Sequence, residues 1–208
     1  MKYVYEFIGT FFLVLTVGMT VLEPKSAGIM APLAIGSVLA VMVFAGGYIS
    51  GGHYNPAVSF SVYLRNRLSL RDLGIYWIVQ LLAGVVAAYL TIYFKGYPAN
   101  PTLALDPVKA FLAEFLFTFA LCFVVLNVAI ASGNKNNSFY GLAIGFTVLA
   151  GAYAVGPVSG AAFNPAVALG ITIMNLSLWS DLWIFLVATL LGGAGAALVF
   201  KEVDQIVR

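Results

Sequence analysis

Apolar residues dominate the chain in six long runs, each interrupted by only a few polar positions. The runs lack the alternation of apolar and polar residues that a half-exposed β-strand shows. At a rise of about 1.5 Å per residue, some 20 apolar residues in a helix cross the hydrocarbon core of a bilayer. The pattern therefore predicts six membrane-spanning helices, near residues 3–22, 29–49, 73–94, 109–131, 139–156 and 179–200.

Two shorter apolar segments, 55–64 and 164–174, each begin with Asn-Pro-Ala. Asparagine is a strong N-cap, and proline is preset for the first turn of a helix. One such tripeptide would indicate only a capped helix. Two of them, each opening a helix too short to span a bilayer, predict a pair of re-entrant half-helices that line a cavity. The candidate site residues are Asn55, Pro56, Ala57, Asn164, Pro165 and Ala166.

The composition places most of the surface in lipid. The chain is 62% hydrophobic and 9% charged, whereas soluble domains carry about 25% charged residues. A net charge of +2 gives no reason to expect nucleic acid as a partner, and a single cysteine excludes an intrachain disulfide. We interpret the first apolar run as a retained span and not as a signal peptide.

The second half of the sequence repeats the first. "LAIG" at 33–36 recurs at 142–145, and "LLAGVVAA" at 81–88 recurs as "LLGGAGAA" at 190–197, both at an offset of 109 residues. The two Asn-Pro-Ala sites have the same offset. Each copy holds three full spans, an odd number, so the second copy must enter the membrane from the opposite side.

The chain is thus expected to form one domain over 1–208, built from inverted repeats at approximately 1–97 and 106–208. Basic residues orient it, because cytoplasmic loops carry an excess of Lys and Arg. Seven are expected on one side, namely Lys2, Arg65, Arg67, Arg71, Lys135, Lys201 and Arg208. Only Lys25, Lys95 and Lys109 are expected on the other. The excess predicts that both termini are cytoplasmic.

Taken together, "SGGHYNPAV", the second Asn-Pro-Ala and the inverted halves resemble the aquaporin (major intrinsic protein) family. The resemblance implies an all-α membrane protein with six transmembrane helices plus two re-entrant half-helices. It implies a homotetramer in the plasma or inner membrane, with a pore in each subunit and with no cofactor or metal. It also implies passive flux of water or small neutral solutes, while the facing half-helix N-termini exclude ions.

Glu6 and Glu114 occupy matching places in the first and fourth spans. The resemblance implies that each carboxylate accepts hydrogen bonds from the backbone of a half-helix loop, and we favour this structural role over a proton relay. His53 has no Cys, Asp or second His at ligand spacing, so a metal site is not expected. We interpret His53 as structural, with gating by pH as the alternative.

The constriction that gives the family its selectivity departs from the usual pattern. By alignment to the motifs, its four positions are Ile35, Ala152, Ala161 and Val167. Water-selective members typically have Phe, His, a small residue and Arg there, and glycerol-conducting members keep the Arg. Without the arginine, the site loses a fixed cation and its fork of donors. The sequence therefore predicts a wider, apolar constriction.

Two questions stay open from the sequence. Tyr48, Tyr153 and Phe163 are close enough in sequence to refill the constriction. The solute is not specified, so water, glycerol, hydrogen peroxide, ammonia, urea and dissolved gases all remain candidates. A secondary transporter with inverted repeats and a structural membrane protein are the competing classes.

Overall fold

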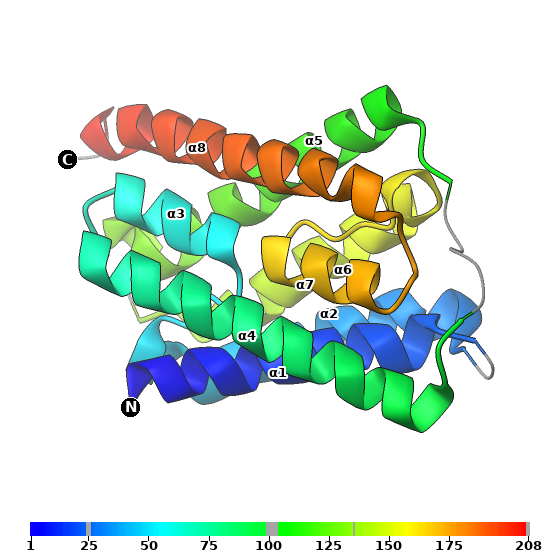
Figure 1. The fold of residues 1–208 in the computed structure, drawn as a ribbon. Helices are drawn as coiled ribbons and strands as arrows, with labels where there is room; N and C mark the ends of the chain where they lie inside the picture. Colours follow the sequence, from blue (N-terminus) through cyan, green and yellow to red (C-terminus); the bar gives the residue numbers. More distant parts are fainter. Residues whose placement is uncertain (24–25, 99–103, 135, 207–208) are drawn as a thin grey trace.

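The structure is a computed structural model that describes residues 1–23, 26–98, 104–134 and 136–206, with side chains described as far as residue 201. Its α-helices run roughly parallel or antiparallel in one bundle (Figure 1). They are α1 (Lys2–Val21), α2 (Ala31–Ser50), α3 (Pro56–Leu64), α4 (Leu70–Lys95), α5 (Pro107–Val125), α6 (Tyr140–Ser159), α7 (Pro165–Ile173) and α8 (Leu182–Ile206). A π-helical turn, Leu126–Ile130, extends α5.

Six of these segments are long and apolar enough to cross a membrane, and α3 and α7 are the two short helices, which confirms the predicted fold class. The helix ends differ from the prediction by a few residues. The prediction ended the fifth span before Pro157, but α6 continues through this proline to Ser159. A proline near the end of a helix removes only one backbone donor, and α6 stops at Gly160, whose φ of 86° suits glycine.

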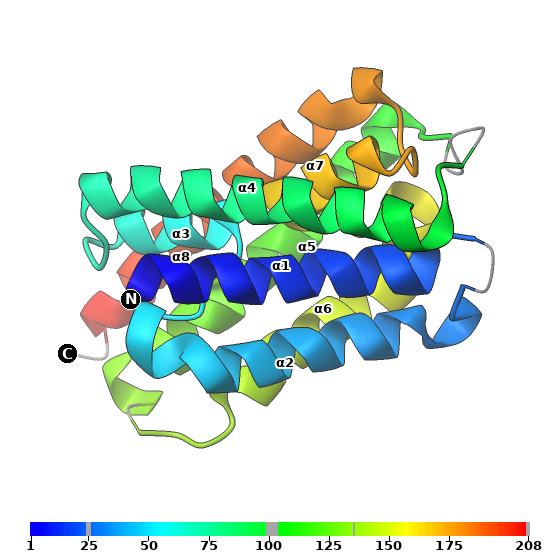
Figure 2. The same cartoon turned by 60° about the horizontal axis from the view of Figure 1, so that its bottom comes forward.

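The same packing arrangement occurs twice in the molecule. In the first half α1 packs against α2 and α4, and in the second half α5 packs against α6 and α8. The short helices cross between halves, so that α3 packs on α8 and α7 packs on α4 (Figures 1 and 2). Helices α2 and α6 join the two halves directly. The half-helices α3 and α7 are thus held inside the bundle by helices of the other repeat.

Two glycines allow the short helices to approach the long ones closely. A Cβ atom on Gly84 of α4 would lie 2.7 Å from the carbonyl oxygen of Ala166 in α7. A Cβ atom on Gly193 of α8 would lie 2.8 Å from the carbonyl oxygen of Ala57 in α3. Both separations are too short for a real Cβ contact, so each half-helix depends on a bare backbone surface on its neighbour.

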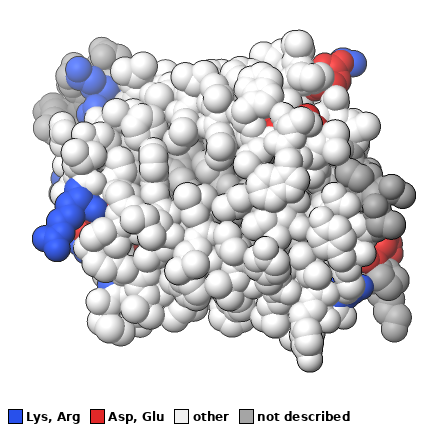
Figure 3. Space-filling view, viewed as in Figure 1, with Lys and Arg blue, Asp and Glu red and all other residues white. Residues whose placement is uncertain are grey.

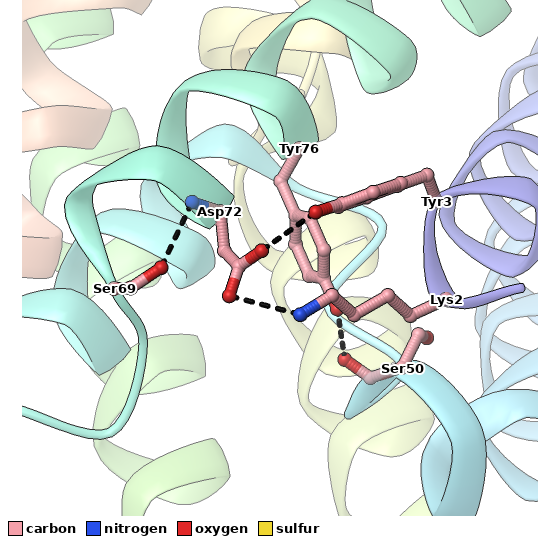
Figure 4. A network of polar contacts seen from close by, with 6 residues as sticks. All are labelled: Lys2, Tyr3, Ser50, Ser69, Asp72 and Tyr76. Atoms are coloured by element: carbon pink, nitrogen blue, oxygen red, sulfur yellow. Dashed lines mark hydrogen bonds and ion pairs between the residues drawn. The ribbon is translucent and has the colours of Figure 1, made fainter.

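Charged side chains gather at the two ends of the bundle, and the face seen in Figure 3 is uncharged between them. Both termini lie at one end, which we call the termini end (Figure 1). There Lys2 Nζ lies 2.9 Å from an Asp72 carboxylate oxygen, and the Tyr3 hydroxyl donates to Asp72 Oδ1 at 2.8 Å (Figure 4). Ser69 caps α4 by accepting from the Asp72 N–H at 3.1 Å. The contacts of Lys2 and Tyr3 with Asp72 therefore connect the start of α1 to the start of α4.

Candidate functional site

Asn55 and Asn164 each cap a half-helix with the side-chain oxygen. Asn55 Oδ1 accepts from the Ala57 N–H at 2.8 Å, and Asn164 Oδ1 accepts from the Ala166 N–H at 2.9 Å. The proline that follows each asparagine stands at the first helical position, where a missing N–H removes no helical bond. This local chemistry explains why both short helices begin at the asparagines.

The amide nitrogens of the same two side chains join the repeats. Asn55 Nδ2 donates to the carbonyl oxygen of Phe163 at 2.8 Å, and Asn164 Nδ2 donates to the carbonyl oxygen of Tyr54 at 2.8 Å. These reciprocal bonds bring the N-termini of α3 and α7 together near the middle of the bundle. An asparagine amide carries two N–H donors, so each side chain keeps a second one beyond the bond just described.

A cavity of about 360 Å³ runs past both asparagines. Asn55, Asn164 and His53 line it. The four positions expected at the constriction also line it, namely Ile35, Ala152, Ala161 and Val167. The proline and alanine of each tripeptide are buried and lie outside this lining; they are Pro56, Ala57, Pro165 and Ala166. The asparagines are therefore the members of each tripeptide that contact the cavity.

The aromatic residues proposed to refill the constriction lie elsewhere in the structure. Tyr48 and Tyr153 are exposed on the surface, with relative accessibilities of 76% and 47%. Phe163 is buried and stacks on Phe117, with ring centroids 5.4 Å apart. None of these three residues is part of the cavity lining that the described chain forms. These rings therefore do not contribute to the lining near the four positions expected to form the constriction.

Glu6 holds the loop that leads into α3. Its Oε1 atom accepts from the Ser50 hydroxyl at 2.7 Å and from the His53 N–H at 2.9 Å. Its Oε2 atom accepts from the Tyr54 N–H at 2.7 Å and from Gln80 Nε2 at 2.9 Å. Tyr54 has a positive φ of 49°, a strained conformation for a bulky residue. The buried carboxylate stabilises that conformation by accepting from the same residue.

Glu114 holds the second loop in the same way. Its Oε1 atom accepts from the Ser159 hydroxyl at 2.7 Å and from the Ala162 N–H at 3.0 Å. Its Oε2 atom accepts from the Phe163 N–H at 2.7 Å, and Phe163 also has a φ of 49°. Both carboxylates are fully buried and accept from loop backbone, the arrangement that the sequence implied for them. Neither glutamate lines the cavity.

Much of the lining consists of aliphatic residues that the sequence did not single out. They include Leu13 and Val17 of α1 and Leu121 and Val125 of α5. An apolar side chain in an apolar helix carries no local signal of the face it occupies. The internal repeat does carry one, because Leu13 and Val17 match Leu121 and Val125 at the offset of 108 residues that also relates Glu6 to Glu114.

Comparisons with known proteins agree with this geometry. The family model of the major intrinsic proteins matches residues 1–200. Nodulin-26 of Glycine max is 35% identical in an alignment 216 positions long, which covers 97% of this chain and 77% of that protein. Aquaporin TIP1-1 of Arabidopsis thaliana is 37% identical over 168 residues, which cover 78% of this chain and 66% of that protein.

A solved structure shares the fold. The aquaglyceroporin of Plasmodium falciparum superimposes with a TM-score of 0.80 at 20% identity, covering 99% of this chain and 96% of the other. The family model extends over nearly the whole chain, and the relatives include named aquaporins. The chain therefore belongs to the major intrinsic protein family, and it is a membrane channel for water and small solutes.

Proposed function

We propose that this channel is permissive, and that it passes several small neutral solutes without strong selectivity for water. The observation that carries the proposal is the lining of the cavity. We call the four positions expected at the constriction the outer ring; they are Ile35, Ala152, Ala161 and Val167. All four are aliphatic, and they line one cavity with both capping asparagines. An aliphatic ring offers little hydrogen bonding of its own and therefore does not favour water over other neutral solutes.

Ion exclusion is assigned to the two half-helix N-termini. Each helix N-terminus carries an effective charge of about +0.5, concentrated on its free N–H groups. The N-termini of α3 and α7 are linked through the bonds from Asn55 and Asn164, so their fields add at one level of the cavity. Cations are repelled at that level, whereas neutral molecules pass and accept hydrogen bonds from the asparagine amides. The outer ring adds no fixed cation, because Val167 stands where an arginine is usual.

We further propose that both termini face the cytoplasm and that the channel lies in the plasma or inner membrane. Lys2, Arg67 and Arg71 lie at the termini end, and basic side chains gather there in Figure 3. Such an excess is typical of the cytoplasmic side. Lys25, Lys135 and Arg208, which also entered this prediction, lie outside the described residues.

A homotetramer is the proposed assembly. Large apolar side chains are exposed along the outer face of the bundle, including Leu33, Val41 and Phe44 on α2. Such a surface suits either lipid or a neighbouring copy of the chain. Native mass spectrometry from detergent should give four times the 22.1 kDa mass of the chain. A monomer under conditions that preserve solute flux would refute this assembly.

The test of permissiveness is Val167→Arg in proteoliposomes. The substitution returns a fixed cation and a bulky donor fork to the outer ring, which should lower glycerol uptake by about tenfold, equivalent to about 1.4 kcal/mol in the barrier. Water flux should fall much less, because water is smaller. Val167→Met is the matched control, since it adds length without charge.

Two outcomes would contradict the proposal. If the unaltered protein moved no neutral solute faster than empty liposomes do, the channel would not be permissive. If Val167→Arg left the uptake of glycerol-sized solutes unchanged, the limiting constriction would lie elsewhere in the cavity. Flux that is linear in the solute gradient and independent of other ions separates a channel from a coupled transporter.

A further inference from the structure

A second, polar hollow of about 670 Å³ lies at the termini end and shares no lining residue with the cavity that passes the asparagines. Its walls come from the starts of α1 and α4, the end of α2 and the turn that follows α3. Figure 4 shows five of its lining residues, namely Lys2, Ser50, Ser69, Asp72 and Tyr76. The proposed function gives this hollow no role.

Arg67 supplies the hollow with an unpaired positive charge. Lys2 and Asp72 form an ion pair at 2.9 Å, so their charges offset each other. Within the described part of the chain the Arg67 guanidinium has no ion-pair or hydrogen-bond partner. The turn after α3 sets its place, since Asn66 has a φ of 56° and the Arg67 N–H donates to the carbonyl oxygen of Val62 at 3.1 Å. The two cations and one anion of the lining leave a net positive charge.

Two hydroxyl groups add neutral donors to the lining, which includes Tyr63 and Ser69. The Ser69 hydroxyl accepts from the Asp72 N–H at 3.1 Å, and no acceptor within the described residues takes up its hydrogen. The Tyr63 hydroxyl likewise has no partner among the described residues. A guanidinium fork with nearby hydroxyl donors suits a phosphate group, because the charged oxygens of a phosphate diester only accept hydrogen bonds.

The internal repeat shows that the fold alone does not produce this charged hollow. The second repeat has apolar side chains at the matching positions: Ala110 for Lys2, Leu176 for Arg67 and Phe185 for Tyr76. All three of these apolar residues are buried, with exposures of 5% or less. The same architecture is thus packed with apolar groups at one end of the bundle and opened to charged and polar groups at the other.

The hollow lies at the level expected for lipid headgroups. Helices α1 and α4 are long and apolar enough to cross a membrane, and they begin at Lys2 and Leu70, which both line the hollow. Leu70 is 68% exposed, and the exposed residues Ile78 and Leu82 follow it along α4. A lipid phosphate in the hollow can therefore keep its acyl chains against the apolar surface of this helix.

We propose that the hollow binds the phosphate diester of an anionic phospholipid, with Arg67 as the principal ligand and the hydroxyls of Tyr63 and Ser69 as further donors. The net positive charge of the lining favours an anionic headgroup over one that carries a choline cation. The proposal goes beyond the proposed function, because it depends neither on the solute that passes nor on the side of the membrane that the termini end faces.

Ser50 connects this site to the pore. Its hydroxyl donates to Glu6 Oε1 at 2.7 Å and accepts from the Gly52 N–H at 3.1 Å, and Gly52 lines the cavity. The Tyr76 hydroxyl donates to the Ser50 carbonyl oxygen at 2.6 Å, and both residues line the hollow. A phospholipid bound in the hollow therefore stabilises the loop that leads into α3.

Binding is tested by native mass spectrometry of the delipidated channel in detergent, titrated with phosphatidylglycerol or with phosphatidylcholine. Phosphatidylglycerol should bind more tightly, and Arg67→Gln should weaken its binding by about tenfold to a hundredfold, the range expected for hydrogen bonds to a charged group. Arg71→Gln is the matched control, because Arg71 is an exposed cation in the same region that lies outside the lining of the hollow. This control should keep most of the affinity.

Three outcomes would overturn the site. They are equal binding of the two lipids, equal losses in Arg67→Gln and Arg71→Gln, and displacement of phosphatidylglycerol by inorganic phosphate at the same concentration. The last result would assign the hollow to free phosphate instead of lipid. Both variants should unfold at the temperature of the original protein when no lipid is added, which shows that a loss of binding is not a loss of folding.

The connection to the pore is tested by hydrogen exchange of the backbone amides of Gly52, His53 and Tyr54. Phosphatidylglycerol should slow their exchange relative to phosphatidylcholine in the original protein and in Arg71→Gln, but not in Arg67→Gln. If the lipid bound without changing the exchange of these amides, the hollow would not stabilise the loop.

Discussion

Replacing Glu114 by glutamine tests whether a buried carboxylate holds the second half-helix loop. The amide nitrogen must take the place of one carboxylate oxygen. At the Oε2 position it would face the Phe163 N–H, and at the Oε1 position it would face the Ala162 N–H. The Ser159 hydroxyl can rotate to accept from an amide, but a backbone N–H cannot. Either orientation leaves one buried backbone donor without a partner.

The expected loss follows from that donor. A hydrogen bond to a charged group contributes about 1.5–3 kcal/mol, and an unpaired buried donor forfeits it. In a chain of this length about 1 kcal/mol corresponds to 2–4 °C, so Glu114→Gln should lower the unfolding temperature by about 3–12 °C. The Phe163 backbone, at a φ of 49°, then loses the bond that opposes its strain.

The assay is thermal unfolding of the purified channel in detergent, with solute flux measured on the same preparations. Asp106→Asn is the matched control, because it makes the same change from carboxylate to amide at an exposed helix N-cap. Asparagine caps a helix as well as aspartate does, so this variant should unfold like the original protein. If Glu114→Gln were as stable as the control, the Glu114 carboxylate would not anchor the loop.

Two further substitutions examine the packing and the termini end. Gly84→Ala should destabilise the channel by about 1–3 kcal/mol, because the added Cβ would press on the Ala166 carbonyl oxygen. Gly74→Ala is the control, because Gly74 has open space around it and the substitution should not destabilise the channel. Equal unfolding temperatures for the two variants would contradict the close approach at Gly84. Asp72→Asn removes the ion pair with Lys2 and should cause a small loss of stability that shrinks at high salt. A large loss of stability that does not depend on salt would contradict the interpretation of Asp72 as the partner of a surface ion pair.

The sequence predicts the two half-helices well because their signal is local. Asparagine followed by proline specifies the start of a helix wherever it occurs, and the structure begins α3 and α7 directly after Asn55 and Asn164. The bonds from these side chains to Phe163 and Tyr54 could not be predicted in the same way. They join residues more than 100 positions apart and depend on how the repeats pack.

The lining of the cavity is the part of the structure that is hardest to predict from the local sequence. A membrane helix is apolar all round, so periodicity does not separate the pore face of α5 from its lipid face. Leu121 and Val125 were therefore not predicted to line the cavity. Val167 was singled out only because a family resemblance assigns a role to its position. The internal repeat supplies part of the missing information, since Val58, the counterpart of Val167, also lines the cavity, whereas Val43, the counterpart of Ala152, does not.

The reciprocal bonds between the asparagines and the opposite loops have a consequence for biosynthesis. When the first repeat has left the ribosome, Asn55 has no Phe163 carbonyl to reach, and the Tyr54 carbonyl has no asparagine to accept from. Helix α3 also lacks α8, against which it packs. Until the second repeat follows, the first half-helix has only the contacts that its own repeat provides, such as those of Glu6 with the loop that leads into it. A chain truncated after the first repeat should therefore be less stable than the whole channel, because the N-terminus of α3 and its contact face for α8 lack the partners that the second repeat provides.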